Sequence, residues 1–246
     1  MASIAPDADA PQDVPKIGSW QAATVLDIRP ETARVKTFRL ALPEQAPHMA
    51  GQHFLVRLTA PDGYTAQRSY SVATPPNDSR EIELTVERLD DGEVSTFLHD
   101  ETVVGDMVEV RGPIGGWFVW DGSSPALLVG GGSGVVPLMA MLRLARTRPD
   151  QRLAKLVLSV RTPEDLIYAG EIQGPDTSVV YTRQTPAGVD RAPGRLTTED
   201  LRPHVREDAT TYVCGSSRFA EAASDLLVDA GVSADAIRVE RFGPTG

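Results

Sequence analysis

A cluster of glycines between two apolar segments constrains this chain more than any other feature. Residues 127–129 are Leu-Leu-Val, residues 130–134 are Gly-Gly-Gly-Ser-Gly, and a largely apolar stretch opening Val-Val-Pro follows to Arg148. This order predicts a strand, a tight turn and a helix, with Pro137 in the first helical turn, where its missing N–H costs nothing. Glycines allow positive φ and close approach of a bound group, and the free N–H groups of a helix start favour an anion. The stretch is therefore interpreted as a phosphate cradle.

Two better-known phosphate motifs do not fit these glycines. A P-loop needs Gly-Lys followed by Ser or Thr, which is absent here, and the full dinucleotide fingerprint needs a glycine where Pro137 stands. An ordinary glycine-rich turn between a strand and a helix would have the same sequence. The surrounding segments must decide between these two interpretations.

The composition excludes several classes of protein. The chain has 246 residues and a net charge of −10, which argues against nucleic acid as the main partner because that would need a basic face. No run reaches the ~18 apolar residues of a membrane span, and the N-terminus lacks a basic and then apolar signal peptide. We therefore expect a cytoplasmic protein with no membrane span and no nucleic-acid partner.

Metal and disulfide chemistry is not expected either. Cys214 is the only cysteine, so an internal disulfide, a four-cysteine iron–sulfur cluster and a cysteine zinc site are excluded within this chain. The histidines show no spacing typical of metal ligands, and they are expected to lie at the surface or to be packed; they are His48, His53, His99 and His204. The sequence predicts no metal site.

Two changes in composition divide the chain. Residues 1–14 are rich in Ala, Asp and Pro and are expected to form a disordered tail, with order beginning near Trp20. The second change follows residues 121–124, Asp-Gly-Ser-Ser, where a series of short strands gives way to alternating strands and helices. We therefore expect one domain over residues 15–121 and another over residues 122–246.

The first domain is predicted to be all-β. Residues 81–87 alternate polar and apolar side chains, as a half-buried strand does. A series of six short strands is typical of an antiparallel β-barrel or a sandwich, and one short helix is expected over residues 94–99. The six predicted strands are residues 21–29, 34–41, 53–59, 68–73, 81–89 and 107–111.

The second domain is predicted to be an α/β doubly wound parallel sheet. Buried strands are expected over residues 127–129, 156–160, 179–182, 211–213 and 237–241. Helices are expected between them, over residues 135–148, 163–172, 198–205 and 218–230. In such a fold, ligands bind at the carboxyl ends of the strands.

Six short motifs, in this order and spacing, resemble the ferredoxin–NADP reductase family of flavoproteins. Each motif alone is weak, but together they run across two domains of the right class, and the resemblance covers residues 19–246. The motifs are Arg68 to Ser71 (Arg-Ser-Tyr-Ser), Gly92-x-x-Ser95, Arg111-Gly112-Pro113-x-Gly115, Gly132-x-Gly134-x-x-Pro137, Tyr212-Val213-Cys214-Gly215 and Glu240-Arg241-Phe242.

The resemblance implies a flavin site in the β-barrel. In the tetrad, which includes Ser69, Arg68 would neutralise the flavin phosphate, Tyr70 would stack on the isoalloxazine, and Ser71 would hydrogen-bond near flavin N5. The flavin pyrophosphate would be received by a turn and helix start comprising Gly92, Val94, Ser95 and Thr96. FAD is favoured, and FMN is less favoured. Taken alone, the tetrad is more typical of a strand with an exposed arginine, and the helix start is typical of simple capping.

The resemblance also implies a nicotinamide site in the second domain. Ser133 and Gly134 would meet the dinucleotide phosphates, and Cys214 with Gly215 would lie where the family places the nicotinamide. Phe242 would cover the flavin until nicotinamide displaces it. The residues expected at the reacting groups are Ser71, Cys214, Glu240 and Phe242. A buried cysteine acting as a small apolar residue and a C-terminal aromatic in the core are the alternatives.

The arginines of the second domain favour NADPH over NADH. Its second strand ends at Arg161 with no acid until Glu164, and its third ends in Thr182-Arg183. The latter pair resembles the Ser/Thr-Arg pair that grips the 2′-phosphate in NADP-using relatives. Arg191 and Arg195 follow in a Pro- and Gly-rich loop. A solvated arginine loop is the alternative.

The resemblance implies a reductase that passes electrons from a reduced nicotinamide through FAD to a one-electron acceptor. The chain ends four residues after Phe242 and has one cysteine, so the acceptor is expected to be separate, such as a ferredoxin, a flavodoxin or an oxygenase component. One alternative is the reductase component of a multicomponent oxygenase. Another is an electron-transfer or regulatory subunit that binds flavin and nucleotide without turnover alone. The sequence predicts no oligomeric state.

Overall fold

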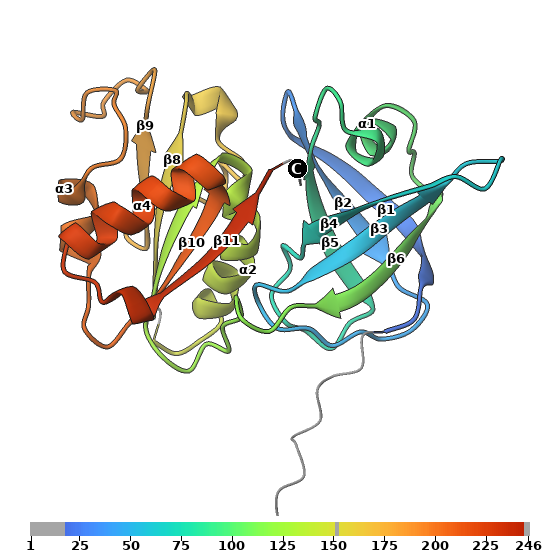
Figure 1. The fold of residues 1–246 in the computed structure, drawn as a ribbon, viewed down its shortest axis with the longest axis horizontal. Coiled ribbons are helices and arrows are strands. Elements are labelled where there is room, and N and C mark those ends of the chain that lie inside the picture. Colours follow the sequence, from blue (N-terminus) through green and yellow to red (C-terminus); the bar gives the residue numbers. More distant parts are fainter. Residues whose placement is uncertain (1–17, 151–152, 244–246) are drawn as a thin grey trace, which may run out of the picture.

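The computed structural model describes residues 18–150 and 153–243, which form two domains side by side (Figure 1). The tail expected over residues 1–14 lies outside the described residues. The first sheet comprises β1 (Gln21–Thr32), β2 (Val35–Ala41), β3 (His53–Thr59), β4 (Thr65–Ser71), β5 (Glu81–Glu87) and β6 (Met107–Ile114), with α1 (Glu93–Asp100) between β5 and β6.

The first sheet closes on itself, which confirms the predicted antiparallel barrel. Its strand order is β4-β3-β6-β1-β2-β5, and every neighbouring pair is antiparallel. An antiparallel bridge between Val72, directly after β4, and Leu84 of β5 joins the two ends of this order. Closure removes the free edges that an open sheet would leave.

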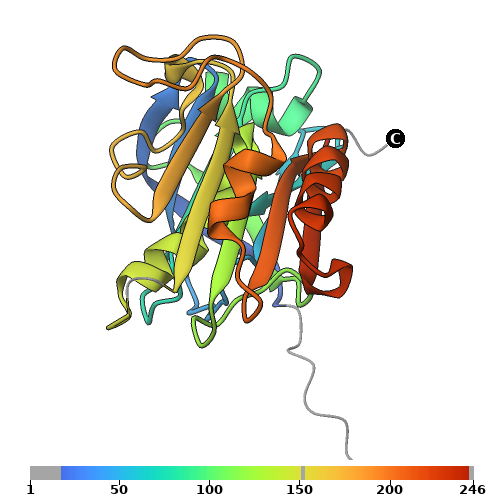
Figure 2. The ribbon, with the colours of Figure 1, turned by 90° about the vertical axis from the view of Figure 1, so that its left-hand side faces the viewer.

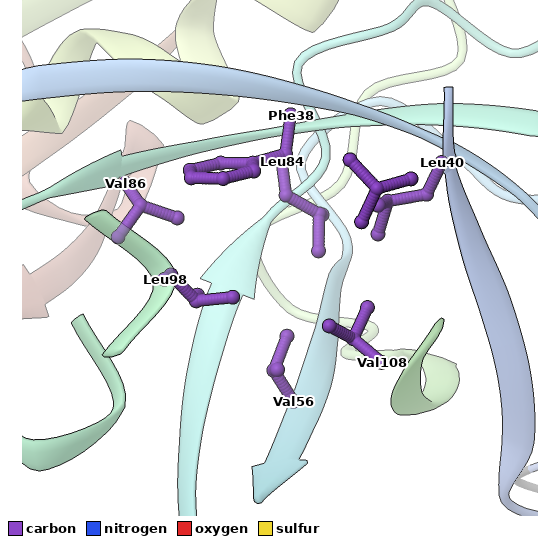
Figure 3. A pocket seen from close by; sticks show the side chains of 8 residues that line it. Phe38, Leu40, Val56, Leu84, Val86, Leu98 and Val108 are labelled. Atoms are coloured by element: carbon purple, nitrogen blue, oxygen red, sulfur yellow. The ribbon is translucent and has the colours of Figure 1, made fainter. Parts of the chain in front are cut away.

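The interior of the barrel is apolar. Figure 3 shows a small cavity there, walled by Phe38 and by aliphatic side chains from the strands, with Leu98 of α1 at one end. No polar side chain lines it, so it offers nothing that could bind a phosphate or a flavin ring. This cavity belongs to the core, and the functional site must lie on the outside of the barrel.

The second sheet is parallel throughout and confirms the predicted α/β domain, which lies in front of the barrel in Figure 2. Its strand order is β11-β10-β7-β8-β9. The strands are β7 (Ala126–Gly131), β8 (Ala154–Val160), β9 (Thr177–Tyr181), β10 (Thr210–Ser216) and β11 (Ile237–Phe242), and the longer helices are α2 (Val135–Arg146) and α4 (Ser217–Asp229).

Two helices predicted in this domain are wrong in whole or in part. Residues 163–172 contain only the 3-10 helix η2 (Pro163–Asp165), because Tyr168 adopts a positive φ of 59° that no right-handed helix contains. The helix expected over 198–205 is divided into α3 (Thr198–Leu201) and the 3-10 helix η3 (Arg202–His204). Pro203 has no N–H to donate to the carbonyl four residues earlier, so the α-helix ends there.

Helix α2 is buried on all sides between the parallel sheet and the barrel. Its apolar side chains pack in one cluster with the sheet residues Leu128 and Leu156 and also with Phe118 and Trp120, which follow the last barrel strand. A helix that is apolar all round is stable only when neighbours cover every face. The buried residues of α2 are Val135, Val136, Pro137, Leu138, Met139, Ala140, Met141, Leu142, Leu144 and Ala145.

The burial of α2 makes a measurable prediction about stability. Leu138 is 0% exposed, so Leu138→Ala is expected to lower the free energy of unfolding by about 2–5 kcal/mol through lost contacts and a residual cavity. Val228→Ala on α4 is the control, because Val228 is 50% exposed and should change stability by less than about 0.5 kcal/mol. Urea unfolding followed by circular dichroism measures both variants, and equal effects would contradict this account of α2.

Candidate functional site

The Arg-Ser-Tyr-Ser tetrad lies on β4, which pairs along its length only with β3. Arg68 and Ser69 are exposed, and Tyr70 is half-buried against the barrel core. Arg68 donates one hydrogen bond, from Nη1 to the carbonyl of Gln67 at 2.8 Å, and forms no ion pair with any described residue. Ser71 is 3% exposed. β4 therefore carries an exposed cation, Arg68, that pairs with no described carboxylate, and it ends in the buried hydroxyl of Ser71.

Three buried side-chain polar atoms have no hydrogen-bond partner among the described residues. They are Ser71 Oγ, Thr74 Oγ1 and Glu240 Oε2. A buried polar group without a partner costs about 1–3 kcal/mol, so such atoms are rare and require an explanation. Two of them lie on or just after β4 and the third lies on β11, the strand whose last residues lie between the domains (Figure 1). Their position indicates a site that a ligand would complete.

The start of α1 uses its side chains for folding. Ser95 Oγ accepts a hydrogen bond from the Leu89 amide and donates one to the Gly92 carbonyl, each at 3.1 Å. Thr96 Oγ1 donates to the Leu89 carbonyl at 3.1 Å, and Val94 is buried in the barrel core. Gly92 is the N-cap. These side chains shape the loop, so only the backbone of the helix start is left to meet an anion.

The glycine turn is shaped by contacts within the second domain. Gly132 is exposed with a positive φ of 55°. A Cβ at Gly134 would lie 2.2 Å from the carbonyl oxygen of Cys214, so the close approach of β10 explains why residue 134 is glycine. Close approach of a ligand is therefore not needed to explain the glycine at position 134. Ser133 is half-buried beside it.

The ends of β10 and β11 bring Cys214 and Glu240 together. The two residues are partners in the strand register, and Ser216 is the partner of Phe242. Burial, with the nearby Glu240 carboxylate, holds the pKa of the Cys214 thiol well above its usual value, so the thiol stays protonated. Burial also raises the pKa of Glu240 to about 7. A carboxyl group that can hold or release a proton near neutral pH thus lies beside Cys214, whose carbonyl oxygen approaches the glycine turn.

An open pocket of about 230 Å³ lies at the carboxyl ends of β8 and β9. Ser159 and Thr182 mark those strand ends, Arg195 and Leu196 come from the following loop, and α4 supplies the opposite wall. The residues of α4 that line the pocket are Phe219, Ala222, Ala223 and Leu226. The pocket is therefore mostly apolar with one arginine at its rim, as expected of a nucleotide site.

Some arginines near this pocket are paired with carboxylates of the protein, and others are free to bind a ligand. Arg191 donates to both carboxylate oxygens of Asp200 at 2.7 Å and to backbone carbonyls of its own loop. Arg161 pairs with Asp165 at 2.9 Å. The side chains of Arg183 and Arg195 are exposed and have no hydrogen-bond or ion-pair partner in the described part of the chain. Of the arginines expected to bind a phosphate, Arg183 and Arg195 are available, and Arg161 and Arg191 already hold loops.

Sequence analysis missed two residues that border these sites. His53 of β3 lies directly opposite Ser71 in the strand register, and burial lowers its pKa. The ring of Phe219 packs where a Cβ at Gly131 or Gly215 would lie, 2.6 Å away in each case. The hairpin register could have indicated His53. Phe219 carries no signal in the sequence, because only the packing of α4 brings it to the turn.

The described residues contain no group of three or more His, Cys, Asp or Glu side chains close enough to hold a metal ion. None of the helices within residues 18–150 and 153–243 is long and apolar enough to cross a membrane.

Two family models match this chain in succession. Residues 23–119 match the oxidoreductase FAD-binding domain, and residues 128–225 match the oxidoreductase NAD-binding domain. The first model covers the barrel, and the second covers the parallel sheet up to α4.

Curated relatives are similar over nearly all of this chain but are longer. The flavohemoprotein of Bordetella pertussis is 30% identical over 92% of this chain and 61% of the relative. The reductase component of propane 2-monooxygenase from Rhodococcus jostii is 28% identical over 89% of this chain and 62% of the relative. The chain thus spans about three fifths of the length of these relatives.

Solved structures share the two-domain fold. The flavohem-like FAD/NAD-binding domain of a nitric oxide dioxygenase from Vibrio cholerae superposes with a TM-score of 0.78 at 23% identity, covering 91% of this chain and 99% of that one. An Amycolatopsis cytochrome P450 reductase gives 0.78 at 26% identity, covering 93% and 71%. A ferredoxin NADP+ reductase from Neisseria gonorrhoeae with bound FAD and NADP gives 0.75 at 21% identity, covering 91% and 99%.

The raised pKa of Glu240 predicts a pH dependence of stability. The carboxyl titrates near its usual 4.5 in the unfolded chain and at about 7 in the folded one, so the folded state binds more protons between these values. The free energy of unfolding is therefore expected to fall as the pH rises through this range, by up to about 3 kcal/mol, and to level off above it.

Glu240→Gln is expected to remove this fall and to be more stable than the parent at pH 8 but not at pH 5. Glu221→Gln, which changes an exposed residue of α4, is the control and should keep the parental pH dependence. Urea unfolding of the flavin-free proteins at the two pH values measures the effect. If Glu240→Gln keeps the parental pH dependence, the fall in the free energy of unfolding comes from other groups.

Proposed function

This chain belongs to the ferredoxin–NADP reductase family of flavoproteins, and from that membership we propose that it passes electrons from NADPH through FAD to a separate one-electron acceptor. The observation that carries the proposal is the position of the unpartnered buried atoms, Ser71 Oγ, Thr74 Oγ1 and Glu240 Oε2. Two of them lie at or just after the end of β4, within the matched FAD-binding region, and the third lies on β11, in the last strand of the second domain. A flavin ring with polar edges would supply the partners that these atoms lack.

We assign FAD to the domain over residues 15–121 and the nicotinamide to residues 122–246. Arg68, exposed and without an ion pair, would neutralise a flavin phosphate, and Tyr70 would lie against the ring. Ser69 would add a hydroxyl, and Ser71 would donate from its buried hydroxyl. Bound flavin accepts two electrons from a nicotinamide and releases them one at a time, which is chemistry of the cofactor rather than of the protein.

The second domain would orient the nicotinamide against the flavin. The glycine turn with Ser133 would receive the phosphates through the backbone of the helix start. Cys214 would border the nicotinamide as a protonated thiol, and Glu240 would be protonated below its pKa of about 7 and ionised above it. Phe242, half-buried at the end of β11, would cover the flavin ring and exclude water from it.

We propose that Thr182, Arg183 and Arg195 recognise the 2′-phosphate of NADPH. Thr182 and Arg195 line the pocket, and Arg183 follows Thr182 directly. Arg191 and Arg161 serve this site indirectly, because their guanidinium groups hold the surrounding loops through Asp200 and Asp165. In this assignment, Arg183 and Arg195 bind the ligand, and Arg161 and Arg191 hold the loops in place.

The reductase component of a multicomponent oxygenase is a second candidate function. One relative carries the name of a propane 2-monooxygenase reductase component, and one structural neighbour carries the name of a ferredoxin reductase in carbazole 1,9a-dioxygenase. In that case the acceptor would be a ferredoxin or the oxygenase itself. Steady reduction of a free ferredoxin by this chain alone favours the first function, and reduction only in the presence of an oxygenase component favours the second.

The flavin assignment predicts a yellow protein from which heat releases FAD, identified by chromatography. Arg68→Ala is expected to weaken FAD binding by about one to two decades for each charged hydrogen bond lost, each worth about 1.5–3 kcal/mol. Arg39→Ala is the control, because Arg39 is an exposed arginine of the same barrel that pairs with Glu81 at 3.0 Å. Titration of the flavin-free proteins with FAD measures the affinities. A parent that takes up neither FAD nor FMN would refute the proposed function.

The phosphate assignment predicts at least a tenfold preference for NADPH over NADH in kcat/KM, since one or two charged hydrogen bonds are worth about 1.5–3 kcal/mol each. Arg183→Ala should remove most of this preference by weakening NADPH alone. Arg202→Ala, an exposed arginine of η3 outside the pocket, should keep it. Steady-state kinetics with both coenzymes measures this. Equal turnover of the parent with NADH would overturn the coenzyme assignment and leave the flavin assignment standing.

A further inference from the structure

One arginine of α2 crosses from the second domain to the barrel. Arg143 Nη1 donates to the Ala73 carbonyl at 2.8 Å and to Glu83 Oε2 of β5 at 3.0 Å. Its Nε and Nη2 donate to the carboxylate of Glu171, at 2.8 and 2.5 Å. The side chain is only 14% exposed. A guanidinium with its donors divided in this way ties both domains through one rigid planar group.

A tyrosine from the same side of the second domain makes a second link. Tyr168 Oη donates to Thr85 Oγ1 of β5 at 2.5 Å, and its backbone amide donates to Glu31 Oε2 at the end of β1 at 3.2 Å. Its ring lies 5.0 Å from the guanidinium carbon of Arg143. Tyr168 has the positive φ that breaks the predicted helix, and such backbone strain persists where surrounding contacts hold it.

These links connect the two candidate cofactor sites. Helix α2 begins directly after the glycine turn and carries Arg143 two turns further along, while Ala73 follows Ser71 by two residues. The Ala73 amide in turn donates to the Glu83 carbonyl at 2.8 Å. Arg143 therefore bonds the helix of the nucleotide turn to the segment that continues from the flavin-facing strand.

We propose that Arg143 and Tyr168 are positioning residues that set the approach of the nicotinamide domain to the flavin. We refer to them, with their barrel partners Ala73, Glu83, Thr85 and Glu31, as the domain clamp. The inference rests on the proposed function. Electron transfer from nicotinamide to flavin needs the two rings in one stacked geometry, and a misplacement of about 1 Å costs about 10²-fold in rate. Neither residue is among those assigned to the reacting groups, so the clamp would act on the rate through the position of α2.

Arg143→Gln is the primary test, and Arg146→Gln is its matched control. Arg146 also lies on α2, pairs with Asp176 at 2.7 Å and donates to the Glu171 carbonyl at 3.0 Å, but all these contacts stay within the second domain. Both variants should retain FAD and bind NADP+ with dissociation constants within about threefold of the parent. In Arg143→Gln alone, the long-wavelength absorption of nicotinamide stacked on flavin should be lost. The rate of flavin reduction in stopped-flow mixing should fall at least about tenfold.

Tyr168→Phe and Thr85→Val test the clamp through milder substitutions, so the inference stays testable even if Arg143→Gln does not fold. Each removes one hydroxyl at nearly constant volume and breaks the Tyr168–Thr85 hydrogen bond, and Thr85→Val also removes the hydrogen bond between Thr85 and Thr37. The double variant should therefore slow reduction no further than Thr85→Val alone. In the flavin-free protein, the Tyr168 amide should exchange its hydrogen at least about tenfold faster in Arg143→Gln than in Arg146→Gln. That measurement does not depend on turnover.

Parental reduction rates and an intact stacking absorption in Arg143→Gln would overturn the inference. Equal slowing by Arg146→Gln would also overturn it, because a general effect of α2 would then explain both variants. If the parent binds FAD and is reduced by NADPH but the clamp variants behave like the parent, the inference is wrong and the proposed function still holds. A parent that binds no flavin overturns the proposed function and the inference together.

Discussion

The burial of α2 is the constraint on which the rest of this structure depends. Apart from Arg143 and Arg146 the side chains of the helix are apolar and buried, and the parallel sheet alone could cover only one side of it. The barrel therefore has to pack against the other side, which places the segment after β4 against the helix that follows the glycine turn. Both candidate cofactor sites take their relative position from this one packing arrangement.

The hydrogen bonds around the candidate site distinguish side chains that hold its loops in place from side chains that are free to bind a ligand. Ser95, Thr96, Arg161 and Arg191 have side chains that the sequence offers for phosphate binding, yet each is hydrogen-bonded into its own loop. Their role is to hold the backbone in place. The groups without partners among the described residues lie on or just after β4, on β11 and beside the pocket. Polar groups left unsatisfied in an otherwise paired structure are the clearest physical sign of a ligand site.

Polar contacts across the domain boundary add geometry to the apolar packing. Apolar contacts between α2 and the barrel supply attraction but little direction, because they depend on buried area. The hydrogen bonds of Arg143 and Tyr168 depend on distance and angle, so they select one arrangement among those that packing would allow. A reaction between two bound cofactors depends on their relative position, so one defined arrangement of the two domains matters more for it than added stability.

The sequence by itself determined the two fold classes, most of the strands along the chain and the motifs of the candidate sites, because hydrophobic period, glycines and capping residues act over a few neighbouring positions. Only the tertiary structure decided what depends on distant partners. It showed that Gly134 is glycine because β10 lies against it, and that residues 163–172 are not helical because Tyr168 reaches the barrel. It also showed which arginines are already paired. Whether a side chain is free to bind a ligand depends on partners that packing brings close, and these partners cannot be identified from the local sequence.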